Sequence, residues 1–228
     1  MSQSEIAYIE VDGRSIAYRR RKGTLPTLVF FPGYASDMEG AKALALDAFA
    51  EARGLAMLRF DYSGTGSSKG RFEDGTLDRW LDEALAAVDQ LTEGPLVLIG
   101  SSMGGWIALH LAQCRPERVR ALVGIASAPD FTDWGAERNA DYLPSAFRES
   151  GQKLLLLNGD ITVDCPVRLI HGEVDGDVPV DIAFRTMRAL RSADVQLQII
   201  KGGGHRLSEP HEIDAILATV TTLLEQAV

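Results

Sequence analysis

The sequence predicts a single α/β domain in which a mostly parallel, eight-stranded sheet carries helices on both faces. Apolar runs of strand length alternate with helical patterns along the chain, which is typical of a parallel sheet with helical connections. The later runs are continuously apolar, as in strands that are covered on both faces. With 228 residues and 46% hydrophobic content, the chain can bury one substantial core and is short for two domains.

Eight segments have the length and composition of strands. The first two flank Asp12-Gly13, which predicts an antiparallel hairpin. Apolar residues at helical spacing indicate two of the helices, over 77–91 and 213–224. The expected strands are 8–11, 16–19, 28–31, 55–60, 96–99, 121–125, 167–170 and 195–200.

The segment 130–164 is the one long interruption of this alternation. It contains Phe131, Trp134, Tyr142 and the leucine run 154–157. We interpret the segment as a short lid within the domain that lines an apolar pocket. The alternative is an extra helix that packs on the core in the ordinary way.

The charge and composition of the chain narrow the classes of partner and compartment. The net charge of −9 argues against a nucleic-acid partner or an anionic membrane surface, because both need clustered Lys and Arg. The single basic run, 19–22, is expected to form a solvated turn. No signal-peptide core and no stretch of roughly 18 apolar residues is present, so we expect a cytoplasmic protein without membrane insertion. Cys114 and Cys165 lack metal-site or disulfide spacing, and we expect both to be structural.

The segment Gly100-Ser101-Ser102-Met103-Gly104 lies between an apolar strand and a helix. It has the Gly-x-Ser-x-Gly pattern of a nucleophile elbow, a sharp turn that exposes the serine hydroxyl. The free N–H groups at the start of the helix can stabilise negative charge. Ser102 is therefore the candidate nucleophile. The alternative is an ordinary glycine-rich turn whose serine caps the helix.

A serine nucleophile needs a general base, and the chain offers four histidines. His205 follows the last strand in a glycine-rich loop, and open α/β sheets place their active sites at the carboxyl ends of strands. We therefore predict that His205 is the base. His110 lies on an apolar helix and is expected in the core, His171 ends a strand, and His211 lies in the first turn of the last helix.

The imidazole in turn needs a carboxylate that fixes its tautomer and compensates its charge. The loop 173–179 contains two candidates. Asp175 lies at the expected position, and Asp177 is the alternative because a glycine-rich turn could bring either side chain inward. The resulting chain order of Ser, Asp and His is that of the α/β-hydrolase fold.

A negatively charged tetrahedral intermediate needs two hydrogen-bond donors. The N–H of Met103, directly after the serine, is the first. We expect the second from Tyr34, in the loop after the strand 28–31, because Gly33 permits a close backbone approach. The alternative for Pro32-Gly33 is a simple turn. Neither a metal ion nor an organic cofactor is expected.

Several further motifs are more specific than the elbow alone. They are Phe31-Pro32-Gly33-Tyr34, Gly40 with Lys42-Ala43-Leu44-Ala45, Arg59-Phe60-Asp61-Tyr62-Ser63-Gly64 with Gly66-Ser67-Ser68, Gly100-Ser101-Ser102 with Gly104-Gly105-Trp106, and Cys165-Pro166 with Arg168-Leu169 and His171-Gly172. In register and over nearly the whole domain, these motifs closely resemble the abhydrolase-domain palmitoyl-protein thioesterases of animal mitochondria, which are also known as mycophenolic acid acyl-glucuronide esterases.

The resemblance implies a serine hydrolase of acyl thioesters or carboxylic esters, with Ser102, Asp175 and His205 as its triad. Its substrate would be a small acyl compound or an acylated protein. Two departures from the animal enzymes are a shorter segment 130–164 and the lack of a mitochondrial presequence, which favour a bacterial-type cytoplasmic relative. Two alternatives remain: another triad hydrolase, such as a carbon–carbon hydrolase or a peptidase, and a ligand-binding homologue without turnover.

Overall fold

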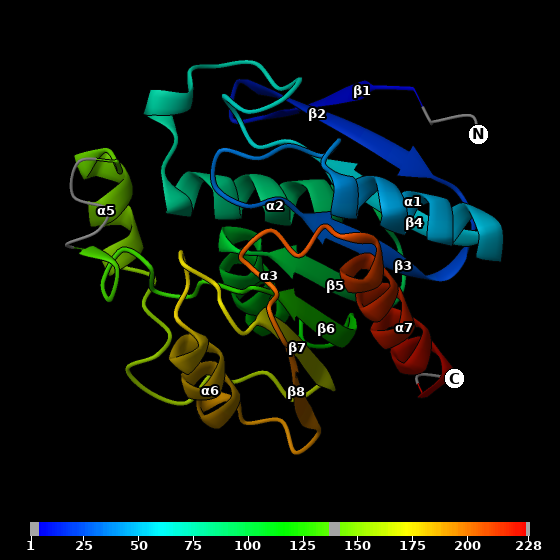
Figure 1. The fold of residues 1–228 in the computed structure, drawn as a ribbon. Coiled ribbons are helices and arrows are strands. Elements are labelled where there is room, and N and C mark those ends of the chain that lie inside the picture. Colours follow the sequence, from blue (N-terminus) through cyan, green and yellow to red (C-terminus); the bar gives the residue numbers. More distant parts are fainter. Residues whose placement is uncertain (1–4, 137–141, 227–228) are drawn as a thin grey trace.

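The computed structural model describes residues 5–136 and 142–226 and contains the predicted eight-stranded sheet (Figure 1). The strands are β1 (Ala7–Val11), β2 (Arg14–Arg21), β3 (Thr24–Phe31), β4 (Leu55–Phe60), β5 (Leu96–Ser101), β6 (Val119–Ile125), β7 (Val167–Gly172) and β8 (Val195–Ile200). Their order in the sheet is β1-β2-β4-β3-β5-β6-β7-β8. The six strands from β4 to β8 in this order run parallel to one another.

The predicted N-terminal hairpin is confirmed. Val11 pairs with Arg14 in the antiparallel ladder between β1 and β2, so Asp12 and Gly13 form a two-residue turn. Both turn residues have positive φ, 48° and 76°, as a tight hairpin with the right-handed twist of the strands requires. β2 then pairs antiparallel with β4, so the hairpin extends one edge of the parallel sheet.

Helices cover both faces of the sheet, as predicted (Figure 1). They are α1 (Ala41–Arg53), α2 (Leu77–Leu91), α3 (Met103–Cys114), α5 (Ser145–Gln152), α6 (Val180–Ala189) and α7 (Pro210–Gln226), with a 3₁₀ turn η1 at Phe72–Asp74. On one face, Leu46 of α1 and Val220 of α7 belong to the same buried cluster. On the other face, Trp80, Ile107 and Ile182 join α2, α3 and α6 in a second cluster. The central strands are therefore buried between two apolar layers.

The last strand differs from the prediction of burial on both faces. β8 is an edge strand, and its first four side chains alternate between half-buried and exposed. Gln196 and Gln198 occupy the exposed positions. The prediction is therefore wrong for β8, because one face of this edge strand meets solvent.

The basic run 19–22 is not the solvated turn that its composition predicts. Its three arginines belong to β2, which pairs with β4. Arg21 donates hydrogen bonds to both carboxylate oxygens of Asp47, at 3.2 and 2.9 Å, and to Glu51 at 3.2 Å. Both acidic residues lie on α1, so a helix distant in sequence neutralises part of the run.

The segment 130–164 both packs on the core and approaches the candidate site. Its residues 137–141 lie outside the described part of the chain. Phe147 of α5 is fully buried. Asp130 holds the later part of the segment, because its carboxylate accepts the N–H of Leu156 at 2.8 Å.

Candidate active site

The turn between β5 and α3 presents Ser102. Its backbone has φ 55° and ψ −121°, a strained conformation for a residue with a side chain. The Ser102 N–H donates to the carbonyl of Ile125 at 2.9 Å and so ties the turn to the end of β6. Gly104 lets α3 begin close to β3, because a Cβ atom there would lie 2.0 Å from the carbonyl oxygen of Phe31. These contacts hold the predicted elbow at the carboxyl ends of the central strands.

His205 lies between Ser102 and Asp175. Its Nε2 atom is 3.0 Å from Ser102 Oγ, and its Nδ1 atom is 2.9 Å from Asp175 Oδ2. The serine follows β5, the aspartate follows β7 and the histidine follows β8, so three strand ends bring the side chains together. With Nδ1–H donating to the carboxylate, Nε2 is free to accept the serine proton.

The surroundings of Asp175 favour its ionised form. The side chain is fully buried, and Oδ1 accepts the N–H groups of Asp177 at 2.9 Å and Val178 at 2.8 Å. Burial raises the pKa of the Asp175 carboxyl, but the hydrogen bonds from His205 and from these N–H groups outweigh it and hold the pKa below its ordinary value. A carboxylate that stays ionised can stabilise a positively charged imidazole.

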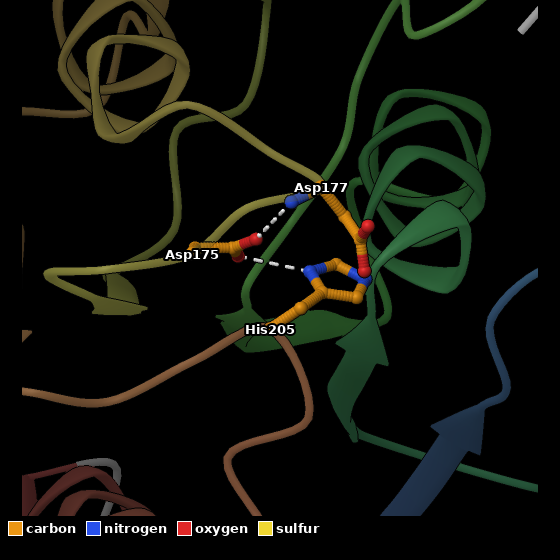
Figure 2. Close-up of side chains that lie close together, drawn as sticks. All are labelled: Asp175, Asp177 and His205. Atoms are coloured by element: carbon orange, nitrogen blue, oxygen red, sulfur yellow. Dashed lines mark hydrogen bonds and ion pairs between the residues drawn. The ribbon is translucent and has the colours of Figure 1, made fainter. Parts of the chain in front are cut away.

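The two candidate carboxylates occupy different positions. Asp177 is exposed and lines the cavity beside the serine. One of its oxygens lies within 4.8 Å of a His205 ring nitrogen and of an Asp175 oxygen. Figure 2 shows Asp175 at one end of the imidazole ring and Asp177 at the other. The geometry therefore favours Asp175 as the partner of His205. The same three side chains could offer ligand atoms to a metal ion, although the His205–Asp175 hydrogen bond already engages two of them.

A second histidine supports the loop that carries Asp175. His171 ends β7 and is 1% exposed. Its Nε2 donates to the carbonyl of Val178 at 2.9 Å and lies 3.4 Å from Asp175 Oδ2. The ring thus joins both ends of the turn 175–178 to the end of the strand. Sequence reasoning missed this role, although a histidine four residues before the acid, at the end of an apolar run, was the available signal.

The other two histidines are placed elsewhere. The His110 ring is half-buried, and its Nε2 donates to the carbonyl of Leu154 at 2.8 Å, which Trp106 Nε1 also reaches at 3.0 Å. Burial lowers the pKa of His110. His211 is exposed in the first turn of α7. Of the four histidines, all of them in described parts of the chain, His205 is the one that contacts the Ser102 hydroxyl.

The expected oxyanion donors lie next to the serine. Met103 is the first residue of α3, so its N–H belongs to the group that a helix leaves without an internal acceptor. Gly33 brings the loop after β3 against the elbow, since a Cβ atom there would lie 3.3 Å from Ser102 Cβ. This close approach places the next residue, Tyr34, in the wall of the cavity that contains the serine.

A cavity of about 450 Å³ opens beside Ser102 and His205. Four aromatic side chains, Tyr34, Phe131, Trp134 and Tyr142, line it together with Ala128, Gly176, Asp177 and Val178. The Tyr34 ring packs edge-on against Phe147 and Tyr142, with centroids 5.0 and 5.4 Å apart. Burial raises the pKa of Tyr34 to about 12, so its hydroxyl is neutral at physiological pH. The cavity has the size and apolar character of a site for a small organic group.

The cysteines contribute no nucleophile to this cavity. Burial raises the pKa of Cys165 to about 11, which keeps its thiol protonated and unreactive at neutral pH. Cys114 is a free, exposed thiol at the end of α3. Neither residue lines the cavity around Ser102.

Comparison with known protein families agrees with this fold and elbow. The profile of the α/β hydrolase fold family matches residues 26–148, which is more than half of the chain and includes Ser102. The family assignment agrees with the strand order of the sheet and with the helices on both of its faces. The chain belongs to the α/β hydrolase family.

The most similar proteins include a thioesterase of animal mitochondria. The human palmitoyl-protein thioesterase ABHD10, mitochondrial, is 37% identical over 236 aligned residues, which cover 93% of this chain and 77% of that protein. The structure of the mouse alpha/beta hydrolase domain-containing protein 10 matches with a TM-score of 0.93 at 34% identity, over 99% of this chain and 100% of that one. A protein of Agrobacterium vitis S4 described as a hydrolase matches with a TM-score of 0.88 at 37% identity, over 96% and 98% of the two chains. The predicted resemblance is confirmed.

The compartment stays a prediction. The human relative is named as a mitochondrial protein, which differs from the cytoplasmic location that we expect for this chain. Among the described helices, none has both the length and the apolar character needed to cross a bilayer.

Proposed function

We propose that this hydrolase cleaves acyl thioesters or carboxylic esters through an acyl-enzyme formed on Ser102. The observation that carries the proposal is the 3.0 Å contact from Ser102 Oγ to His205 Nε2, continued by the 2.9 Å contact from His205 Nδ1 to Asp175. A serine becomes a nucleophile when a base takes its proton, and the base works when a carboxylate orients it.

In the first half-reaction, Ser102 Oγ attacks the carbonyl carbon while His205 Nε2 takes the serine proton. The N–H groups of Met103 and Tyr34 stabilise the oxyanion of the tetrahedral intermediate. His205 then gives its proton to the leaving sulfur or oxygen as the bond to the carbonyl carbon breaks. Asp175, whose lowered pKa keeps it ionised, stabilises the imidazolium while it exists.

The second half-reaction hydrolyses the acyl-enzyme. His205 takes a proton from a water molecule, whose oxygen attacks the acyl carbon, and the same two N–H groups hold the second oxyanion. The bond to Ser102 Oγ then breaks, and His205 returns the proton to the serine. The carboxylic acid is released, and the scheme uses only groups of this chain and water.

The cavity supports an apolar acyl group. Tyr34, Phe131, Trp134 and Tyr142 place four aromatic side chains in its lining next to Ser102. The name of the human relative, a palmitoyl-protein thioesterase, supports a thioester of a protein cysteine as one substrate class. The resemblance to the animal enzymes also supports acyl-glucuronides, in which the leaving group is a sugar.

A panel of p-nitrophenyl esters and acyl thioesters of graded chain length tests this function. We expect Ser102→Ala and His205→Ala each to lower kcat/KM at least about a thousandfold, because removal of either group stops proton transfer from the nucleophile. Circular dichroism and melting temperature should stay close to those of the wild type. Ser101→Ala, which removes the neighbouring hydroxyl, is the matched control and should keep its activity. Full activity in Ser102→Ala, or no turnover of any substrate by the wild type, would refute the proposal.

A further inference from the structure

The cavity beside Ser102 has one acidic side chain, Asp177, in its lining. This side chain is exposed. The N–H of the same residue donates to Asp175 Oδ1 at 2.9 Å, which fixes the turn through the backbone and leaves the carboxylate free to face the cavity. Within the described residues, no ion pair engages the Asp177 carboxylate. A negative charge without a paired cation therefore stands at the site.

This charge lies on the side of the site where the leaving group departs. An oxygen of Asp177 is within 4.8 Å of a His205 ring nitrogen, and Figure 2 shows it at the end of the ring away from Asp175. Because Asp175 binds Nδ1, the ring nitrogen at the end near Asp177 is Nε2. In the proposed mechanism, Nε2 delivers a proton to the leaving atom, which must approach it to about 2.6–3.2 Å. The next atoms of the leaving group therefore pass close to the Asp177 carboxylate.

We propose that Asp177 makes the enzyme select against substrates whose leaving group carries a negative charge near the scissile bond. This inference rests on the proposed function and specifies its substrate class. Like charges a few ångströms apart repel, and at an exposed site the repulsion is moderate and falls with salt. Thioesters of cysteines in neutral or basic peptides are then the favoured substrates. Of the two substrate classes named under the proposed function, acyl-glucuronides, whose sugar carries a carboxylate, are then the less favoured.

The overall charge of the chain needs a control, since a net charge of −9 also repels anions. Asp181 provides it. This residue lies in the first turn of α6, is exposed, and is not part of the cavity lining. Asp181→Asn removes the same unit of charge as Asp177→Asn, four residues along the chain, without changing the site.

Two thioesters with the same acyl group test the inference, one of N-acetylcysteamine, which is neutral, and one of 3-mercaptopropionate, which is anionic. Thiol release gives kcat/KM for each, and the ratio of the neutral to the anionic substrate is compared between enzyme forms. We expect the ratio to fall about tenfold in Asp177→Asn and to stay unchanged in Asp181→Asn. Differences in intrinsic reactivity, and any general effect of a substitution on the chemistry, cancel in this comparison.

The salt dependence of the wild-type enzyme is a second readout that needs no variant. Raising the ionic strength from about 0.01 to 0.5 M should lower the wild-type ratio of kcat/KM for the neutral to the anionic substrate, because salt screens the Asp177 charge. A wild-type ratio that is independent of salt, or an equal ratio in wild type and Asp177→Asn, overturns the inference. So does an equal fall in Asp181→Asn. If the wild type releases thiol from neither substrate, the proposed function itself fails, which is a different result from an unchanged ratio.

Discussion

Two acidic side chains in one short turn, Asp175 and Asp177, have different surroundings. Asp175 is buried and bonded to His205 and to two backbone N–H groups. Asp177 is exposed and faces the cavity. His171, at the end of the preceding strand, braces the turn through Val178. We infer that the buried carboxylate orients the base, whereas the exposed one meets the substrate.

Replacing each aspartate by asparagine separates these two roles. In Asp175→Asn, an amide can donate to His205 Nδ1 and so favours the tautomer that cannot accept the serine proton. We expect kcat for a neutral p-nitrophenyl ester to fall by about 10³ to 10⁴ in this variant, and by less than tenfold in Asp177→Asn. Steady-state kinetics of the two purified variants measures this, with circular dichroism as the check on folding. A larger loss in Asp177→Asn would reverse the assignment.

The lowered pKa of Asp175 also predicts a pH dependence of stability. A carboxyl whose pKa is lower in the folded protein stabilises the fold fully above its unfolded pKa, about 3.9, and loses that contribution as pH falls through the folded value. We therefore expect the difference in unfolding free energy between the wild type and Asp175→Asn to shrink from about pH 5 to pH 2. Urea unfolding at a series of pH values measures it. A constant difference over this range would contradict the prediction.

At the scale of elements, the site depends on how closely α3 begins against the sheet. A Cβ atom on Gly104 would lie 2.0 Å from the carbonyl oxygen of Phe31 and 2.7 Å from that of Pro32. Both are backbone atoms of β3 and of the loop that leads to Tyr34. The same contact thus joins the elbow to the loop that carries Tyr34, the proposed second oxyanion donor.

Gly104→Ala is expected to disturb stability and activity together. The added methyl group must push α3 away from β3, and overpacking of this kind typically costs about 1–3 kcal/mol of unfolding free energy. Gly159→Ala is the matched control, because a Cβ atom there meets nothing within 4 Å. Urea unfolding and ester hydrolysis measure both effects. If Gly104→Ala were as stable and active as Gly159→Ala, the close approach would not be needed.

Across the whole molecule, the sequence predicts the features that depend on a pattern within one short segment. A local sequence pattern predicts the hairpin at Asp12-Gly13, the elbow at Ser102 and the glycine-rich loop of His205. In the structure, His205 Nε2 lies 3.0 Å from Ser102 Oγ. The proposed triad has the chain order Ser, Asp, His because Ser102, Asp175 and His205 follow β5, β7 and β8 in turn.

The features that the sequence did not predict depend on contacts between distant segments. The sequence predicts that Arg21 belongs to a solvated basic run, whereas in the structure α1 places Asp47 beside it. The exposed face of β8 follows from its place at the edge of the sheet. The bracing role of His171 depends on the path of the turn 175–178. The same path places Asp175, the carboxylate that we expected, against His205, whereas the sequence had left Asp177 as an alternative.

Labelling with a fluorophosphonate probe shows whether His205 activates Ser102. The probe reacts with serines that a neighbouring base has made nucleophilic. We predict that mass spectrometry finds one adduct on the wild type, at Ser102, and an equal adduct on Ser101→Ala. Labelling should be absent in Ser102→Ala and slowed by orders of magnitude in His205→Ala. A folded wild-type protein that stays unlabelled, or labelling of His205→Ala at the wild-type rate, would show that His205 does not activate Ser102.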